Sequence, residues 1–140
     1  MYESITIEGT FFTMKGFYFF FKPLRVPYHK LYYEAKKAGY KLKNLDKDGF
    51  IPIVEKSKSF GFGWIGVEVE NSEKAANDSR IIKLSGEYKS YEHEGPYNQL
   101  GRVYKEIMED EPAAKEYYSI YLNNPATTEE ENLKTLICFR

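Results

Sequence analysis

An imperfect internal repeat constrains this chain more than any other feature of its sequence. Two pairs of residues recur at a separation of 70 positions: Gly16 with Gly86, and Tyr18 with Tyr88. A second set recurs at 69 positions, namely Pro27, Tyr28, Leu31 and Lys36 with Pro96, Tyr97, Leu100 and Lys105. One inserted residue reconciles the two separations. The chain therefore reads as two copies of one strand–helix unit.

Hydrophobic periodicity predicts the same elements in both copies. In the first we expect strands at 2–7 and 11–24, a helix at 28–38, and strands at 50–54 and 64–70. In the second we expect strand at 80–84 and 88–93, a helix at 97–108, and strands at 117–122 and 133–139. Residues 1–71 form repeat one, 72–79 a polar linker, and 80–140 repeat two.

The predicted fold class is α+β, a single domain over residues 1–140. It holds two β-α-β-β repeats related by a pseudo-two-fold axis, with an antiparallel sheet, helices and a central ligand cleft between the repeats.

Composition narrows the classes of function. The 140 residues are 42% hydrophobic and 29% charged, which is typical of a folded domain. A net charge of −1 argues against direct nucleic-acid binding. No apolar run approaches the ~20 residues that span a bilayer, so we expect no membrane partner. A single cysteine forms no disulfide framework, so we expect a cytoplasmic protein. Its oligomeric state is left open between monomer and homodimer.

Aromatic residues supply the candidate site. They make up 17% of the chain, and rings with a polar tip suit the walls of a dry pocket. Tyr117, Ser119 and Tyr121 alternate along one strand and share a face, so they line either the cleft or a solvated sheet surface. Trp64 and Glu68 are expected on the corresponding face of repeat one. There they would seat a cation, unless Glu68 is exposed and Trp64 belongs to the core.

Other candidates are weaker. Tyr28 and Tyr97 begin the two predicted helices, and they either frame the pocket or anchor each helix on the sheet. His29 and His93 have no second ligand at a spacing typical of metal sites, so we expect neither a metal nor a cofactor. Cys138 lies within a predicted strand, where a thiol is usually inert.

Several short motifs in the second repeat resemble the GyrI-like domain, the effector-binding domain of AraC-type and MerR-type multidrug regulators. They are Ser85-Gly86-Glu87-Tyr88, His93-Glu94-Gly95-Pro96-Tyr97, Tyr121-Leu122-Asn123-Asn124-Pro125 and Leu133-Lys134-Thr135-Leu136-Ile137. The resemblance implies a duplicated fold of SHS2-type repeats, with a cleft for bulky, often cationic aromatic compounds. It covers the chain from about residue 80 onward, and we expect a stand-alone form.

Two positions depart from that family. A glutamate that often meets the cationic ligand is replaced here by Ser119, and a second glutamate of the last strand by Leu136. Ser119 and Leu136 are therefore retained as positions in the cleft, but without the acidic groups. We accordingly favour binding over catalysis.

Three hypotheses follow. The first is binding of a hydrophobic, aromatic and in some cases cationic molecule, for sequestration or sensing in toxin or drug resistance. The second is hydrolysis of a strained, cyclopropane-type electrophile, which needs a carboxylate and leaves Glu68 as the only candidate. The third, implied by the family, is a gyrase-inhibitor-like module whose partner is a protein such as a topoisomerase.

Overall fold

A computed structural model describes residues 2–17, 28–43, 49–56 and 62–140. The first half contains β1 (Glu3–Phe17), α1 (Tyr28–Lys37), β2 (Ile53–Lys56) and β3 (Phe62–Glu68). The second half contains β4 (Ile81–Glu94), α2 (Leu100–Asp110), β5 (Tyr117–Tyr121) and β6 (Lys134–Phe139). Short 3₁₀ helices occupy Glu73–Asn77, Tyr97–Gln99 and Glu130–Asn132. The described elements thus run strand, helix, strand, strand twice, while the pseudo-two-fold relation between the halves remains a prediction.

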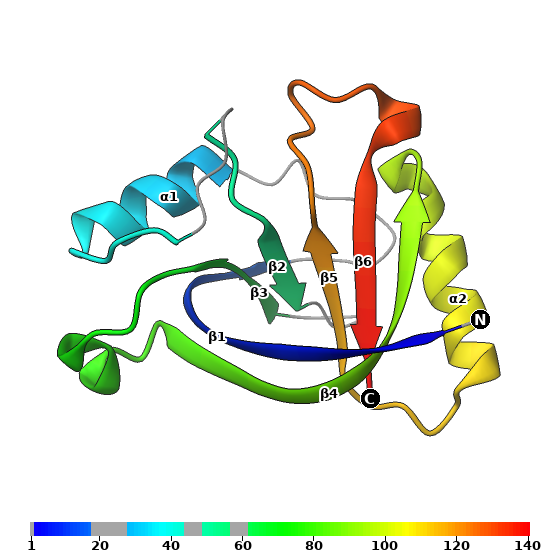
Figure 1. The fold of residues 1–140 in the computed structure, drawn as a ribbon, viewed down its shortest axis with the longest axis horizontal. Coiled ribbons are helices and arrows are strands. Elements are labelled where there is room, and N and C mark those ends of the chain that lie inside the picture. The colour runs from blue at the N-terminus through cyan, green and yellow to red at the C-terminus, as the bar shows by residue number, and fades with distance from the viewer. Residues whose placement is uncertain (1, 18–27, 44–48, 57–61) are drawn as a thin grey trace.

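The sheet closes on itself, which the sequence did not predict. Its strand order is β1-β3-β2-β5-β6-β4, with every pair antiparallel (Figure 1). Closure depends on β1, because its 15 residues pair with β4 over Glu3 to Phe12 and with β3 over Phe11 to Phe17. The halves also meet along β2 and β5. Residues of the two halves are therefore neighbours across two ladders, β1–β4 and β2–β5.

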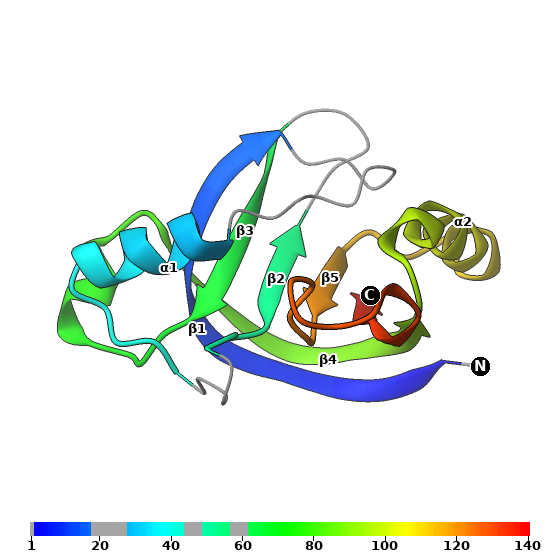
Figure 2. The same ribbon diagram turned by 90° about the horizontal axis from the view of Figure 1, so that it is seen from above.

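The two faces of this barrel carry separate hydrophobic clusters. Side chains from all six strands meet on one face, including Ile7, Val54, Trp64, Leu84, Tyr118 and Cys138. The other face packs against both helices. Since the helices cover that second face, it is the outer face, and the first is the inner face. Figure 2 shows α1 and α2 at opposite ends of the sheet with β2 and β5 between them.

Each helix packs through a short apolar stripe. Leu31, Tyr32 and Ala35 of α1 are buried, and the Tyr32 hydroxyl donates to the Ile51 carbonyl at 2.6 Å and accepts from the Ile51 N–H at 2.7 Å. In α2 the buried residues are Leu100, Val103, Tyr104 and Ile107, at the spacing of one helical face. Each fully buried apolar side chain stabilises the fold by about 1.5–3 kcal/mol, which fixes α2 on the outer face.

The boundaries of the strands differ from those predicted. The segments 2–7 and 11–24 form one strand as far as Phe17, and the remainder of 11–24, like Tyr18 and Pro27 of the repeat, lies outside the described residues. The segments 80–84 and 88–93 are likewise one strand, β4. It continues through Gly86, whose φ of +142° is rarely adopted by other residues. That glycine lets the strand bend without breaking the ladder to β1.

Candidate functional site

A buried carboxylate on β2 is the focus of the candidate site. Glu55 is 4% exposed. Its Oε1 atom accepts a hydrogen bond from the Tyr121 hydroxyl at 2.9 Å, whereas Oε2 is buried and has no hydrogen-bond partner among the described residues. Burial raises the pKa of Glu55 to about 7, and the Tyr121 hydrogen bond offsets part of that increase.

Strand alternation directs Glu55 to the outer face. On β2, Ile53 and Glu55 share that face, while Val54 between them joins the inner cluster. Glu55 lies directly opposite Ser119 of β5 and Ile65 of β3 in the two ladders. The carboxylate is therefore held in the middle of the sheet, on the side that the helices cover.

Tyr121 is surrounded by polar atoms that lack partners. Thr135 of β6 is its direct cross-strand neighbour, and the Tyr97 ring meets the Tyr121 ring edge-on at 5.2 Å between centroids. Three buried side-chain atoms of the described residues make no hydrogen bond: Glu55 Oε2, Tyr97 OH and Thr135 Oγ1. All three belong to residues bordering Tyr121. Native proteins leave few such atoms unpaired, so this concentration makes the surroundings of Tyr121 the candidate functional site.

α2 adds a further hydroxyl to the same region. The Tyr104 hydroxyl hydrogen-bonds the Ser119 hydroxyl. Burial raises the pKa of Tyr104 and of Tyr121 well above the usual tyrosine range, so both phenols stay neutral at physiological pH. We name this set the Glu55 cluster: Glu55, Tyr97, Tyr104, Ser119, Tyr121 and Thr135.

Three of the sequence-predicted site residues belong to the Glu55 cluster: Tyr97, Ser119 and Tyr121. Tyr117 shares their strand face, as predicted from the alternation, and its ring stacks on Phe139 at 6.1 Å. Its hydroxyl donates to the Ala114 carbonyl at 3.4 Å. Tyr117 thus packs near the end of α2, and its ring lies 6.1 Å from that of Tyr104 in the Glu55 cluster.

Trp64, Glu68 and Leu136 lie on the inner face, so the expectation that Trp64 and Glu68 share a face with Tyr121 is wrong. The reason is register: Ile65, not Trp64, stands opposite Glu55. The Trp64 ring lies 6.0 Å from that of Tyr118. Glu68 Oε2 lies 3.6 Å from Lys43 Nζ, with its side chain 22% exposed. Trp64 and Leu136 therefore pack in the inner cluster, and Glu68 lies at its partly exposed edge.

Tyr28 anchors the start of α1. Its ring packs against those of Tyr32 and Phe50, with centroids at 5.6 and 5.5 Å. Its hydroxyl donates to Asn124 Oδ1 at 3.3 Å, which ties the first helix to a loop of the second half. Anchoring is thus its observed role, and contact with a ligand remains a prediction.

Sequence reasoning missed Glu55. The predicted strand 50–54, which Pro52 weakens, ended one residue before it. The available signal was alternation: extending Ile51, Ile53 by one step places a glutamate on an otherwise apolar face. A glutamate on the buried face of a strand is almost never fully buried unless its charge is paired.

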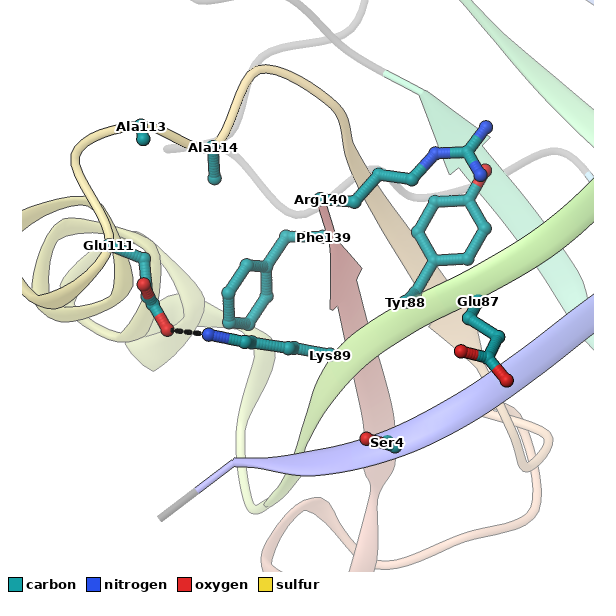
Figure 3. A pocket seen from close by; sticks show the side chains of 9 residues that line it. All are labelled: Ser4, Glu87, Tyr88, Lys89, Glu111, Ala113, Ala114, Phe139 and Arg140. Atoms are coloured by element: carbon teal, nitrogen blue, oxygen red, sulfur yellow. Dashed lines mark hydrogen bonds and ion pairs between the residues drawn. The ribbon is translucent and has the colours of Figure 1, made fainter.

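A surface cavity near the C-terminal end of α2 is less suited to ligand chemistry. It measures about 380 Å³ and is bordered by residues of β1, β4, β6 and the loop after α2 (Figure 3). Its cations are paired: Lys89 bonds Glu111, and Arg140 Nε donates to Glu116 Oε2 at 2.6 Å while its guanidinium lies over the Tyr88 ring. Since these charges are already satisfied and half-exposed, the Glu55 cluster is the stronger candidate.

The sequence from β3 to the end of β6 matches a known family. A family model described as GyrI-like small molecule binding domain matches residues 64–140. The chain belongs to this family. This GyrI-like domain finds no match among curated proteins.

Solved structures share the fold of this GyrI-like domain. The EcmrR C-terminal domain is 17% identical with a TM-score of 0.64, over 99% of this chain and 96% of that one. A hydrolase encoded by lin2189 from Listeria innocua is 20% identical with a TM-score of 0.55, over 99% and 90%. The structure of SAV2435 bound to tetraphenylphosphonium is 16% identical with a TM-score of 0.56, over 99% and 92%. At these identities the likeness shows the fold alone.

In the part of the chain that the structure describes, no three His, Cys, Asp or Glu side chains gather as metal ligands. Nor does any described helix have the length and apolar character needed to cross a bilayer. Cys138 is buried, and burial raises the pKa of its thiol to about 12, so it is not a ready nucleophile.

Proposed function

We propose that this GyrI-like domain binds hydrophobic aromatic molecules that carry a positive charge, with Glu55 as the counter-ion. The observation that carries the proposal is the unpartnered Oε2 atom of a buried carboxylate. An ionised carboxylate is costly to bury without a cation, and no cationic group of the described residues offsets the rise in its pKa. A bound cation would remove that cost.

Tyrosine rings supply the rest of the recognition. Tyr121 of β5 bonds the carboxylate, and Tyr97 of the turn before α2 packs on the Tyr121 ring. Tyr104 of α2 bonds the neighbouring Ser119 hydroxyl. An aromatic ligand would gain about 0.5–1.5 kcal/mol from each favourable ring contact beyond the burial of its area. Tyr97 is the one member of the cluster that is partly exposed, so entry would pass beside this ring.

The position of Glu55 would also compensate for the absence of a glutamate at Ser119. Glu55 stands directly opposite Ser119 on the neighbouring strand. We infer that the carboxylate reaches the inter-repeat region from β2 instead of β5. The tetraphenylphosphonium in the SAV2435 structure is consistent with a cation in a domain of this fold. Sequestration or sensing of such a compound would be the biological role.

A fluorescence polarisation titration with acridine orange, a flat aromatic cation, tests the proposal. Glu55→Gln keeps the shape and the Tyr121 contact but removes the charge, and we expect at least a tenfold loss of affinity. Glu68→Gln is the matched control, because Glu68 lies on the inner face, and it should leave affinity unchanged. Equal affinity of the wild type and Glu55→Gln would refute the role of Glu55.

Hydrolysis of a strained electrophile is a second candidate, favoured by the pKa of Glu55 near 7. Ionised Glu55 would take a proton from water as the water oxygen bonds to a ring carbon. The strained C–C bond breaks, its electron pair moves into the electrophile, and the proton is returned there. Glu55→Gln should then abolish turnover in a chromatographic assay of a cyclopropane substrate. Turnover that persists in this variant excludes the mechanism.

A further inference from the structure

We propose that the cation accepted at Glu55 is a hydrogen-bond donor, a protonated amine or ring N–H, rather than a permanently alkylated cation. This inference rests on the proposed function and names its ligand class. Either kind of cation would neutralise the charge of Glu55. Only a hydrogen-bond donor would also bond the unpaired atoms of the Glu55 cluster.

Glu55 itself provides the first acceptor. Tyr121 already donates to Oε1 at 2.9 Å, which fixes the carboxylate plane and leaves Oε2 without a bond. A carboxylate is an acceptor only, so Oε2 needs a donor, and the described residues supply none. An N–H of the ligand would provide it, whereas an N-alkyl or P-aryl group would cover the oxygen without bonding it.

The hydroxyls of Tyr97 and Thr135 are the next two unpaired atoms. Both can accept a hydrogen bond, and both belong to residues that border Tyr121. The inference extends to these hydroxyls: a ligand that carries more than one N–H would bond one of them in addition to Oε2. A permanently alkylated cation would leave all three buried and unpaired.

Ring contacts do not produce this discrimination. The attraction of a cation to an aromatic face depends on charge and distance, so the tyrosines would hold an alkylated cation as well as a protonated one. A hydrogen bond to a buried charged group instead contributes selectively to the donor. One such bond corresponds to about a tenfold or greater difference in affinity.

A matched pair of dyes tests the inference. Protonated acridine orange carries N–H on its ring nitrogen, and its ring-N-methylated derivative carries N–CH₃ with the same charge and the same flat ring. We expect acridine orange to bind the wild-type protein at least tenfold more tightly by fluorescence polarisation. In Glu55→Gln the ratio of the two affinities should fall toward one.

Each outcome has a defined meaning. Equal binding of the two dyes, with both weakened in Glu55→Gln, overturns this inference and leaves the proposed function standing. No binding of either dye, or binding that is unaffected by Glu55→Gln, overturns both. Glu55→Asp withdraws the carboxylate by one methylene while keeping its charge, and it should also reduce the ratio, which covers the case that Glu55→Gln does not fold.

Discussion

The Tyr121 hydroxyl donates to Glu55 Oε1 at 2.9 Å, joining residues 66 positions apart. It links β5 of the second half to β2 of the first, across one of the two ladders where the halves meet. A buried acid and a buried phenol thus lie together because of strand pairing. Because burial raises the pKa of Glu55, the protonation of this group should affect both the free energy of unfolding and ligand affinity.

Tyr121→Phe removes the hydrogen bond that holds down the pKa of Glu55. We expect that pKa to rise above about 7, and the free energy of unfolding to fall by about 1–3 kcal/mol because Oε1 loses its donor. Denaturant unfolding measures the second effect. Tyr117→Phe is the matched control on the same strand face, since its hydroxyl makes only a 3.4 Å contact with the Ala114 carbonyl. Similar losses in both variants would contradict the assignment.

The stability of the protein should fall as pH rises from about 4.5 to about 7. Burial raises the pKa of Glu55 from 4.5 to about 7, so between these values the folded state binds more protons than the unfolded state. The loss attributable to Glu55 is about 3 kcal/mol and levels off above pH 7. Tyr104 and Tyr121 beside it stay protonated throughout.

Urea unfolding at a series of pH values measures this dependence. Glu55→Gln cannot titrate, so subtracting its curve isolates the contribution of Glu55 from that of other carboxylates. A difference curve that is flat between pH 4.5 and 7 would mean that Glu55 ionises as freely in the folded state as in the unfolded one.

Binding of a cation should show the opposite trend. The ionised form of Glu55 attracts the ligand, so affinity for acridine orange should rise by up to tenfold per pH unit below about 7 and plateau above it. Polarisation titrations from pH 5 to 8 give the profile. A pH-independent affinity in the wild type would show that the dye does not use the Glu55 charge.

Trp64→Phe tests the separation of the two faces. Trp64 is buried against Tyr118 on the inner face, so a smaller ring should lower the free energy of unfolding by about 1–3 kcal/mol. Affinity for acridine orange should stay within twofold of the wild type, because the Glu55 cluster is on the outer face. A marked loss of affinity at unchanged stability would restore Trp64 as a wall of the site.

Tyr97→Phe should not destabilise the protein. Its hydroxyl is buried without a partner, so removing it relieves a desolvation cost and is expected to change the free energy of unfolding by 0 to about +1 kcal/mol. Tyr32→Phe is the contrasting control. It breaks two bonds to Ile51 and should cost about 1–3 kcal/mol. Thermal unfolding of both variants provides the comparison.

Much of the fold could be read from local pattern. The predicted strand segments on either side of Gly86 belong to β4, and Tyr97, the predicted start of the second helix, lies in the turn that leads into α2. The alternation of Tyr117, Ser119 and Tyr121 correctly put them on one face. Trp64 was placed wrongly relative to them, because alternation gives the phase within a strand but not the register between strands.

The sequence by itself determined the α+β class, the order of the helices and strands, and the GyrI-like resemblance, because these depend on periodicity and short motifs within contiguous segments. Only the tertiary structure decided that the sheet closes and that Glu55, not Glu68, carries the buried charge. The physical reason is long-range pairing: β2 meets β5 across 66 residues, and that contact buries Glu55 beneath the helical layer beside Tyr121.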